Sequence, residues 1–214
     1  PKPTLAEEVV FFEEPSRSKA LEMLESGQMH IYAYGLSDPD IKKKIEVSKS
    51  VAYTLSYGNT WEITINPAGP TFQNGKLNPF SVPAIREALN WLIDREYIAQ
   101  ELCFGLARPK FLPIVSAFPD FAQLADICRT LEIKYAHNPD KAKEIITREM
   151  QQLGAALKDG KWTFKDAPVQ IVFLIRTEDI RKRLGDYIST LLEGLGFAVD
   201  RQYKTAQEAS PIWI

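Results

Sequence analysis

The chain has 214 residues, of which 45% are hydrophobic and 25% are charged, a balance typical of an ordinary globular protein. Twenty-six Lys and Arg residues oppose 28 Asp and Glu residues, and the formal net charge of -2 excludes a general attraction to nucleic acid or to an anionic membrane. Its apolar runs are much shorter than the roughly 20 residues that cross a bilayer. Because it begins at Pro1 without an initiator Met or an apolar leader, we expect processing or a choice of boundaries to have removed any preceding segment.

Hydrophobic periodicity predicts alternating helices and strands in the first third of the chain. Ser16 precedes a helical apolar pattern that Gly27 closes, and Asp38 followed by Pro39 is typical of a helix start. The predicted elements are a helix over 16–27, a strand over 29–34, a short helix from 38, and strands over 51–55 and 61–65 around a turn at 57–59.

The middle of the chain is predicted as loops between strong helices. Prolines, glycines and asparagines over 67–79 predict a loop, after which an apolar stripe from Val82 predicts a helix with Ser81 as its N-cap. Asp94–Arg95 interrupts this helix, and its apolar face continues to Gly105. An irregular stretch over 109–119 follows, and Asn138 with Pro139 begins the next helix.

The last third predicts a βαβ unit. After a turn at 159–160 and a hairpin-like strand over 162–164, the pattern gives a strand over 169–175, a helix over 178–195 and a strand over 197–203. The crossover rule favours parallel pairing of these strands, and the order of elements indicates an α/β or α+β fold.

Residue types that would perform chemistry are sparse. No glycine-rich phosphate loop is present, and the two histidines, His30 and His137, lie in no motif with a nucleophile. Cys103 and Cys128 lack the spacing of a zinc or redox site. We expect buried free thiols, with a single disulfide between them as the alternative. The sequence therefore predicts no metal, no cofactor and no enzymatic activity.

Two groups of residues are candidates for ligand binding. Tyr57, Asn59 and Trp61 combine polar donors and aromatic rings around one turn, although core packing is the commoner role of such rings. Arg176 and Arg181 flank the start of the last long helix, where backbone N–H groups also favour an anion. A solvated face balanced by neighbouring acids is the alternative for these arginines.

Four segments, in order, resemble the peptide, dipeptide and nickel type of bacterial and archaeal solute-binding protein, often called family 5. The strongest match contains Arg86–Asn90, Ile93–Arg95 and Gly105–Pro109, which resemble the family patterns R-Q-A-L-N, I-D-R and G-x-A-x-P. His30, Val82 and Ala84 depart from the pattern. The other matching segments are 18–31, 138–143 with 159–162, and 181–199.

The resemblance implies an α/β, periplasmic-binding-protein-like fold (type II, peptide-binding class), here a lobe with a mixed sheet and flanking helices. Residues 1–50 would form the end of the first lobe and the hinge, and residues 51–214 most of a truncated second lobe. By position, Arg181 or a neighbour would meet a peptide carboxylate. An acid that anchors the ligand's amino group would lie downstream of this chain, and the excised lobe would dimerise through exposed apolar surface.

The function that the resemblance implies is that of the extracytoplasmic substrate-binding component of an ABC importer. Such a protein takes a small solute, which is a peptide, an oligosaccharide or a nickel complex, to permease and ATPase subunits, with no nucleic acid involved. The alternatives are a solute sensor on the same fold and a hydrolase that uses the carboxylates of Asp94 and Glu96.

Overall fold

The computed structural model describes residues 5–36, 38–54, 60–116 and 118–213. Contacts between residues divide the chain into two compact units, Pro1–Leu55 and Ser56–Ile214, which are described separately below. The predicted turn at residues 57–59 lies outside the described residues.

The first unit is a pair of short helices, α1 (Arg17–Glu25) and α2 (Pro39–Val47). Ser16 caps α1, and Gly27, with a φ of 75°, follows its end in the left-handed conformation that glycine favours. The helices meet through a small apolar cluster of Leu21, Ile41 and Ile45. Both helix predictions are confirmed.

The strands predicted for this region do not form among the described residues. Residues 29–34, 51–54 and 60–65 run without regular secondary structure, so these predictions are wrong for the described part of the chain. Ile63 and Ile65 do alternate with exposed neighbours and pack against the core of the second unit. Alternation selects which side chains face inward, but it does not provide the partner backbone that makes an extended segment a strand.

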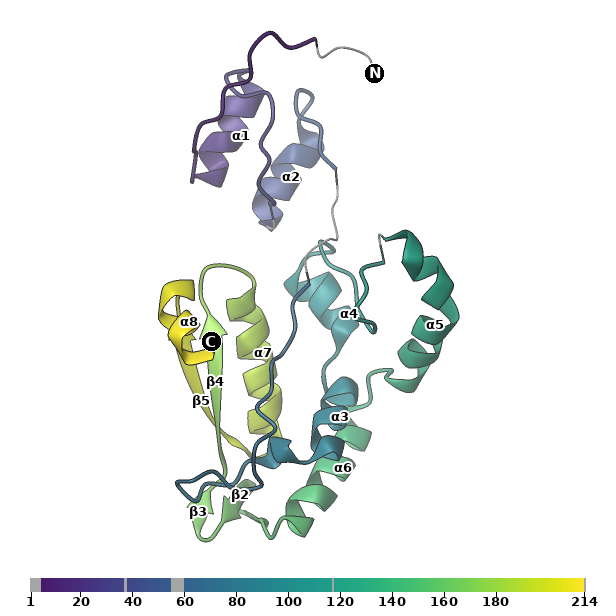
Figure 1. Cartoon of the computed structure of the whole chain (residues 1–214), viewed down its shortest axis with the longest axis vertical. Coiled ribbons are helices and arrows are strands. Elements are labelled where there is room, and N and C mark those ends of the chain that lie inside the picture. Colours follow the sequence, from purple (N-terminus) through teal and green to yellow (C-terminus); the bar gives the residue numbers. More distant parts are fainter. Residues whose placement is uncertain (1–4, 37, 55–59, 117, 214) are drawn as a thin grey trace. The chain divides into compact units, whose positions relative to one another are not determined.

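Two long helices form one side of the second unit. α3 (Pro83–Leu92) packs against α6 (Pro139–Gln152), and the two lie side by side in Figure 1. Asn138 caps α6 by accepting a hydrogen bond from the backbone of Lys141 at 3.0 Å, as the sequence predicted. The expected N-cap of α3 is wrong: Val82 occupies that position, and the Ser81 hydroxyl donates to the backbone of Asn78.

The connection between these helices contains more helix than predicted. Within this connection, α4 (Arg95–Tyr97) continues into a π-helical turn, η2 (Ile98–Leu102), whereas a 3-10 turn, η1 (Pro79–Ser81), comes before it and leads into α3. After an irregular stretch come a 3-10 helix, η3 (Pro119–Leu124), and α5 (Ala125–Lys134), neither of which was predicted. Cys103 and Cys128 are buried free thiols, and burial raises the pKa of both.

In the described part of the second unit, five strands form two small sheets. β1 (Ala156–Lys158), β2 (Lys161–Phe164) and β3 (Ala167–Pro168) form an antiparallel meander. β4 (Gln170–Arg176) and β5 (Ala198–Lys204) pair in parallel, with Gln170 opposite Ala198 and Arg176 opposite Lys204. α7 (Arg181–Gly194) joins them, which confirms the predicted βαβ unit, and α8 (Ala206–Trp213) follows β5.

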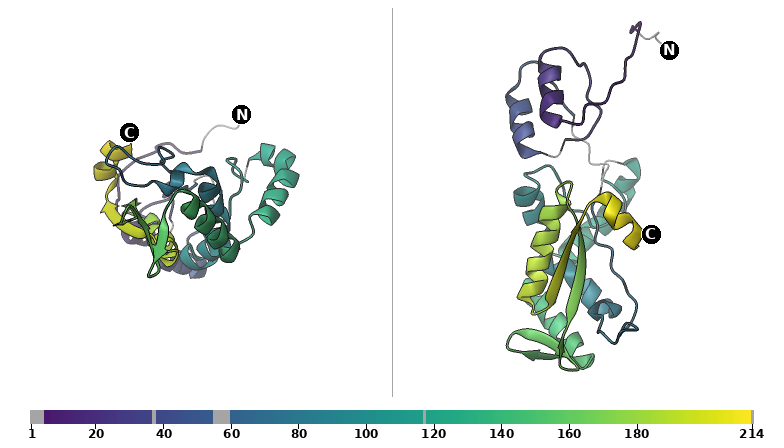
Figure 2. Two further views of the ribbon diagram at one scale, coloured as in Figure 1. Left: turned by 90° about the horizontal axis from the view of Figure 1, so that it is seen from below. Right: turned by 90° about the vertical axis from the view of Figure 1, so that its left-hand side faces the viewer.

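α7 is held against β4 and β5 over most of its length (Figure 2). Gly185 faces Ile175 of β4, so that the helix backbone approaches the strand closely. The C-terminal end of α7 is held by Trp162 of β2. This residue is 1% exposed, and its indole N–H donates a hydrogen bond to the backbone of Leu195, the C-cap of the helix, at 2.9 Å. This packing holds the first turn of α7 beside the carboxyl ends of both strands.

Candidate ligand-binding site

The carboxyl edge of the parallel strand pair gathers the charged residues that the sequence singled out. β4 ends at Arg176 and β5 ends at Lys204, directly opposite in the register. The start of α7 and the start of α8 follow these strand ends in the chain. In open α/β sheets, ligands bind outside the carboxyl ends of the strands, and backbone N–H groups at a helix start favour an anion.

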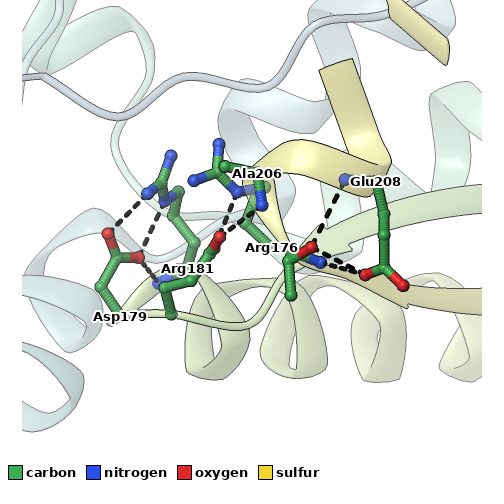
Figure 3. A network of polar contacts seen from close by, with 7 residues as sticks. Arg176, Asp179, Arg181, Ala206 and Glu208 are labelled. Carbon is green, nitrogen blue, oxygen red and sulfur yellow. Dashed lines mark hydrogen bonds and ion pairs between the residues drawn. The ribbon is translucent and has the colours of Figure 1, made fainter. Parts of the chain in front are cut away.

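Arg181 and Asp179 form a two-pronged ion pair at the start of α7 (Figure 3). The Arg181 Nε group donates to Asp179 Oδ1 at 2.8 Å, and one terminal nitrogen donates to Oδ2 at 2.7 Å. Asp179 Oδ1 also accepts the backbone N–H of Arg181 at 3.0 Å. Burial alone would raise the pKa of the Asp179 carboxyl, but these hydrogen bonds hold it below its ordinary value.

Arg176 is held by the other acid of this turn. Its Nε group donates to Glu178 Oε2 at 2.8 Å, and the second oxygen of Glu178 accepts the backbone N–H of Ala206, the first residue of α8. The hydrogen bond from Arg176, followed by that from Ala206, lowers the pKa of Glu178 to about 2. One carboxylate thus connects the end of β4 to the start of α8.

A capping box begins α8. Glu208 accepts hydrogen bonds from the backbone N–H and the hydroxyl of Thr205, both at 2.8 Å. The Thr205 hydroxyl lies 3.4 Å from the backbone nitrogen of Glu208, which gives the reciprocal bond of this motif. This helix was not predicted, although Thr205-x-x-Glu208 is the sequence pattern that marks its start.

An aromatic residue with an uncommon backbone conformation lies beside the first turn of α7. Phe104 has a φ of 53°, uncommon for a residue with a side chain, and remains 41% exposed. The guanidinium of Arg183, in the first turn of α7, lies 5.4 Å from the centre of the Phe104 ring. Phe104 was not predicted as a site residue, because no local sequence pattern marks a residue other than glycine that adopts the left-handed conformation.

Of the predicted binding residues around the turn at 57–59, the structure describes Trp61 alone. Trp61 lies in an extended segment of the second unit with 43% of its surface exposed, whereas Tyr57 and Asn59 lie outside the described residues. Arg176 and Arg181 are brought together at one edge of the fold (Figure 3). The alternative interpretation of these arginines invoked neighbouring acids, and two such acids, Glu178 and Asp179, are their direct partners.

Asp94, one of the two carboxylates that the hydrolase alternative would use, caps a helix. Asp94 Oδ1 accepts the backbone N–H of Tyr97 at 2.9 Å and caps α4, and Oδ2 lies 3.4 Å from Nδ1 of His137. Arg95 ties α4 back to α3 by donating to the side chain of Asn90 at 2.7 Å. Among the described residues, no group of three or more His, Cys, Asp or Glu side chains is arranged to hold a metal ion.

Comparison with solved structures shows the fold. The chain matches a periplasmic oligopeptide-binding protein of Thermotoga maritima, solved with mannohexaose, at a TM-score of 0.54 and 18% identity over 93% of this chain and 36% of that one. The oligopeptide-binding protein AppA of Bacillus subtilis, solved with a nonapeptide, gives a TM-score of 0.47 and 17% identity over 62% of this chain and 25% of that one. NikZ of Campylobacter jejuni, solved with Ni(L-His), gives a TM-score of 0.44 and 19% identity over 59% of this chain and 24% of that one.

The family follows from comparison with family models. Residues 2–210 match the model of the bacterial extracellular solute-binding proteins, family 5, middle region, so the chain belongs to this family. A comparison with curated proteins gave no match. The chain spans about a quarter to a third of the solved structures named above. None of the helices in the part of the chain described here is long and apolar enough to cross a membrane.

Proposed function

We propose that this chain is part of the substrate-binding component of an ABC importer, which binds an oligopeptide or a similar solute outside the cytoplasmic membrane and delivers it to a permease. Membership of the family 5 extracellular solute-binding proteins carries the proposal. We further infer that residues 1–50 form the end of the first lobe and the hinge, and that residues 51–214 form most of the second lobe.

The edge of the β4–β5 pair supports a role in binding the charged end of such a solute. Arg176 and Arg181 bring two guanidinium groups to the carboxyl ends of the strands, beside the first turn of α7. A guanidinium recognises a carboxylate through paired N–H donors, and the nearby helix start adds backbone N–H groups. Both side chains remain partly exposed, at 20% and 36%, so a ligand can reach them.

The proposal is one of binding without chemistry. Asp94 is engaged as a helix cap beside His137, and the hydrolase alternative would need this carboxylate as an acid or base. Release of a peptide or sugar product that stops when Asp94 is changed to Asn would contradict the proposal and restore that alternative.

The test is a ligand screen on the gene product in its full encoded length. Thermal unfolding and titration calorimetry are measured against tri- to nonapeptides, manno-oligosaccharides and a nickel–histidine complex. A ligand that binds only the folded protein stabilises it by about 2.7 kcal/mol when the free ligand concentration is a hundred times the Kd. The unfolding temperature rises accordingly. Micromolar or tighter binding of one class, with the ligand recovered unchanged, is the expected result. Turnover of any candidate, or no binding across all classes, would overturn it.

A further inference from the structure

The pairing of Arg181 with Asp179 has the form of a bound ligand carboxylate. Two parallel N–H donors of one guanidinium meet the two oxygens of one carboxylate, at 2.8 and 2.7 Å. This fork-to-fork arrangement is how arginine recognises carboxylates in general. The donors that the proposed function assigns to a solute are thus already occupied by a carboxylate of the chain itself (Figure 3).

We propose that Asp179 is an internal competitor that sets the selectivity of this site for carboxylate-bearing ligands. The inference rests on the proposed function. A ligand carboxylate that reaches Arg181 must displace Asp179, so an isolated carboxylate binds weakly, and only a ligand with additional contacts elsewhere displaces it. Asp179 is therefore a specificity-determining residue that discriminates against small anions.

The position of Asp179 fits displacement better than a permanent link. Its partner lies only two residues further along the chain, so breaking the ion pair does not separate elements of the fold. The backbone N–H of Arg181, which Asp179 also accepts, can keep its bond while the guanidinium turns away. Both side chains are partly exposed, at 24% for Asp179 and 36% for Arg181, which leaves an anion a route to the pair.

The neighbouring acid serves as the matched control. Glu178 also pairs with an arginine, Arg176, but its second oxygen accepts the backbone N–H of Ala206 and so fixes the start of α8. Removing its charge loosens a connection between elements and leaves the Arg181 fork occupied. Asp179→Asn and Glu178→Gln therefore remove the same charge with different expected results.

The experiment follows the Nε–Hε signals of arginine side chains by NMR in the 15N-labelled full-length protein, with sodium acetate as the probe. The Arg181 signal is identified by its absence from Arg181→Gln. In Asp179→Asn, which keeps a capping oxygen for the Arg181 backbone, we expect the signal to move from its wild-type position and to titrate with about tenfold higher acetate affinity. Asp179→Ser, also a capping residue, provides a second open variant. Wild type and Glu178→Gln should respond weakly and alike.

Equal acetate responses at Arg181 in wild type, Asp179→Asn and Asp179→Ser would overturn the inference, because a merely structural acid would change stability and leave acetate binding unchanged. A second measurement uses calorimetry with trialanine and trialanine amide. The preference for the free acid should rise about tenfold in Asp179→Asn and vanish in Arg181→Gln. If neither peptide binds any variant, the peptide form of the proposed function fails, while the acetate titration still decides the role of Asp179.

Discussion

Gly185 is the position at which one methyl group should most clearly disturb the unit that carries the candidate site. A Cβ atom there would lie 2.6 Å from Cγ2 and 2.8 Å from Cγ1 of Ile175. Both carbons are attached directly to Cβ of a β-branched residue, so they move only if χ1 or the backbone moves. Ile175 is 2% exposed, in the middle of the packing between α7 and β4.

These contacts give the expected magnitude for Gly185→Ala. Overpacking a well-filled core destabilises by about 1–3 kcal/mol, and contacts this short to stiff atoms favour the upper half of that range. Alanine regains about 1 kcal/mol of helix propensity over glycine. The net expectation is a loss of about 1–2 kcal/mol in the free energy of unfolding.

Gly194, in the same helix, is the matched control, because a Cβ there would meet no atom within 4 Å apart from its chain neighbours and the backbone of its own helix. Urea unfolding of the two alanine variants should give a lowered midpoint with an unchanged slope for Gly185→Ala, and a midpoint at or above wild type for Gly194→Ala. In a protein that already carries Ile175→Ala, Gly185→Ala should cause no further loss of stability, which is the coupling expected of residues in contact. Equal midpoints for the two single glycine variants would refute the steric reasoning.

Three further predictions concern buried and charged groups. The Ser189 hydroxyl is buried with no hydrogen-bond partner among the described residues. Ser189→Ala should therefore raise the free energy of unfolding, measured by urea titration, by up to about 1 kcal/mol. A lower free energy of unfolding would show that the hydroxyl does have a hydrogen-bond partner. Asn78, 4% exposed, donates to two backbone carbonyls and accepts one N–H. Asn78→Ala should therefore cost about 2–3 kcal/mol, against little change for Asn74→Ala in the exposed part of the same loop. The pKa of Glu178 is lowered to about 2 by Arg176 and a backbone N–H, so its stabilising contribution is complete above the ordinary value of 4.5 and disappears as pH falls toward 2. The gap in unfolding free energy between wild type and Glu178→Gln should close over that window, and a gap that stays constant would contradict the assignment.

The helices were predictable where capping and periodicity agree. Asn138 followed by Pro139 specifies a helix start through a side-chain hydrogen bond and a fixed φ, both local effects that need no other part of the chain. α5 was missed because its apolar face is thin: Cys128 is its one buried residue, and no capping side chain marks its start. A helix with such weak local signals depends on its surroundings.

Whether a predicted strand forms depends on a partner strand, which the segment's own residues do not provide. β4 and β5 were predicted correctly because α7 between them brings their backbones together within one βαβ unit. The segments over 29–34 and 61–65 are also rich in apolar and aromatic residues, but no partner strand is paired with them in the described part of the chain. Composition selects a pleated conformation, whereas a ladder of hydrogen bonds depends on what lies alongside.

The candidate site was predictable only in part for a related reason. Arg176 and Arg181 could be placed because they flank a helix start in the sequence, and their acids are near neighbours. The bond from Ala206 to Glu178 spans 28 positions, and no local pattern connects those two residues. It is this longer connection that ties α8 to the end of β4.

The two acids at the edge of the sheet therefore have different physical consequences, although they are adjacent and carry the same charge. Glu178 bridges β4 and α8, so its charge contributes to the architecture that presents Arg176. Asp179 pairs with a side chain of its own turn and can release it without separating any element. An acid of the first kind is expected to affect stability and its pH dependence, and one of the second kind to affect ligand selectivity. Stability measured on Glu178→Gln and acetate binding measured on Asp179→Asn would thus separate architecture from recognition within two consecutive residues.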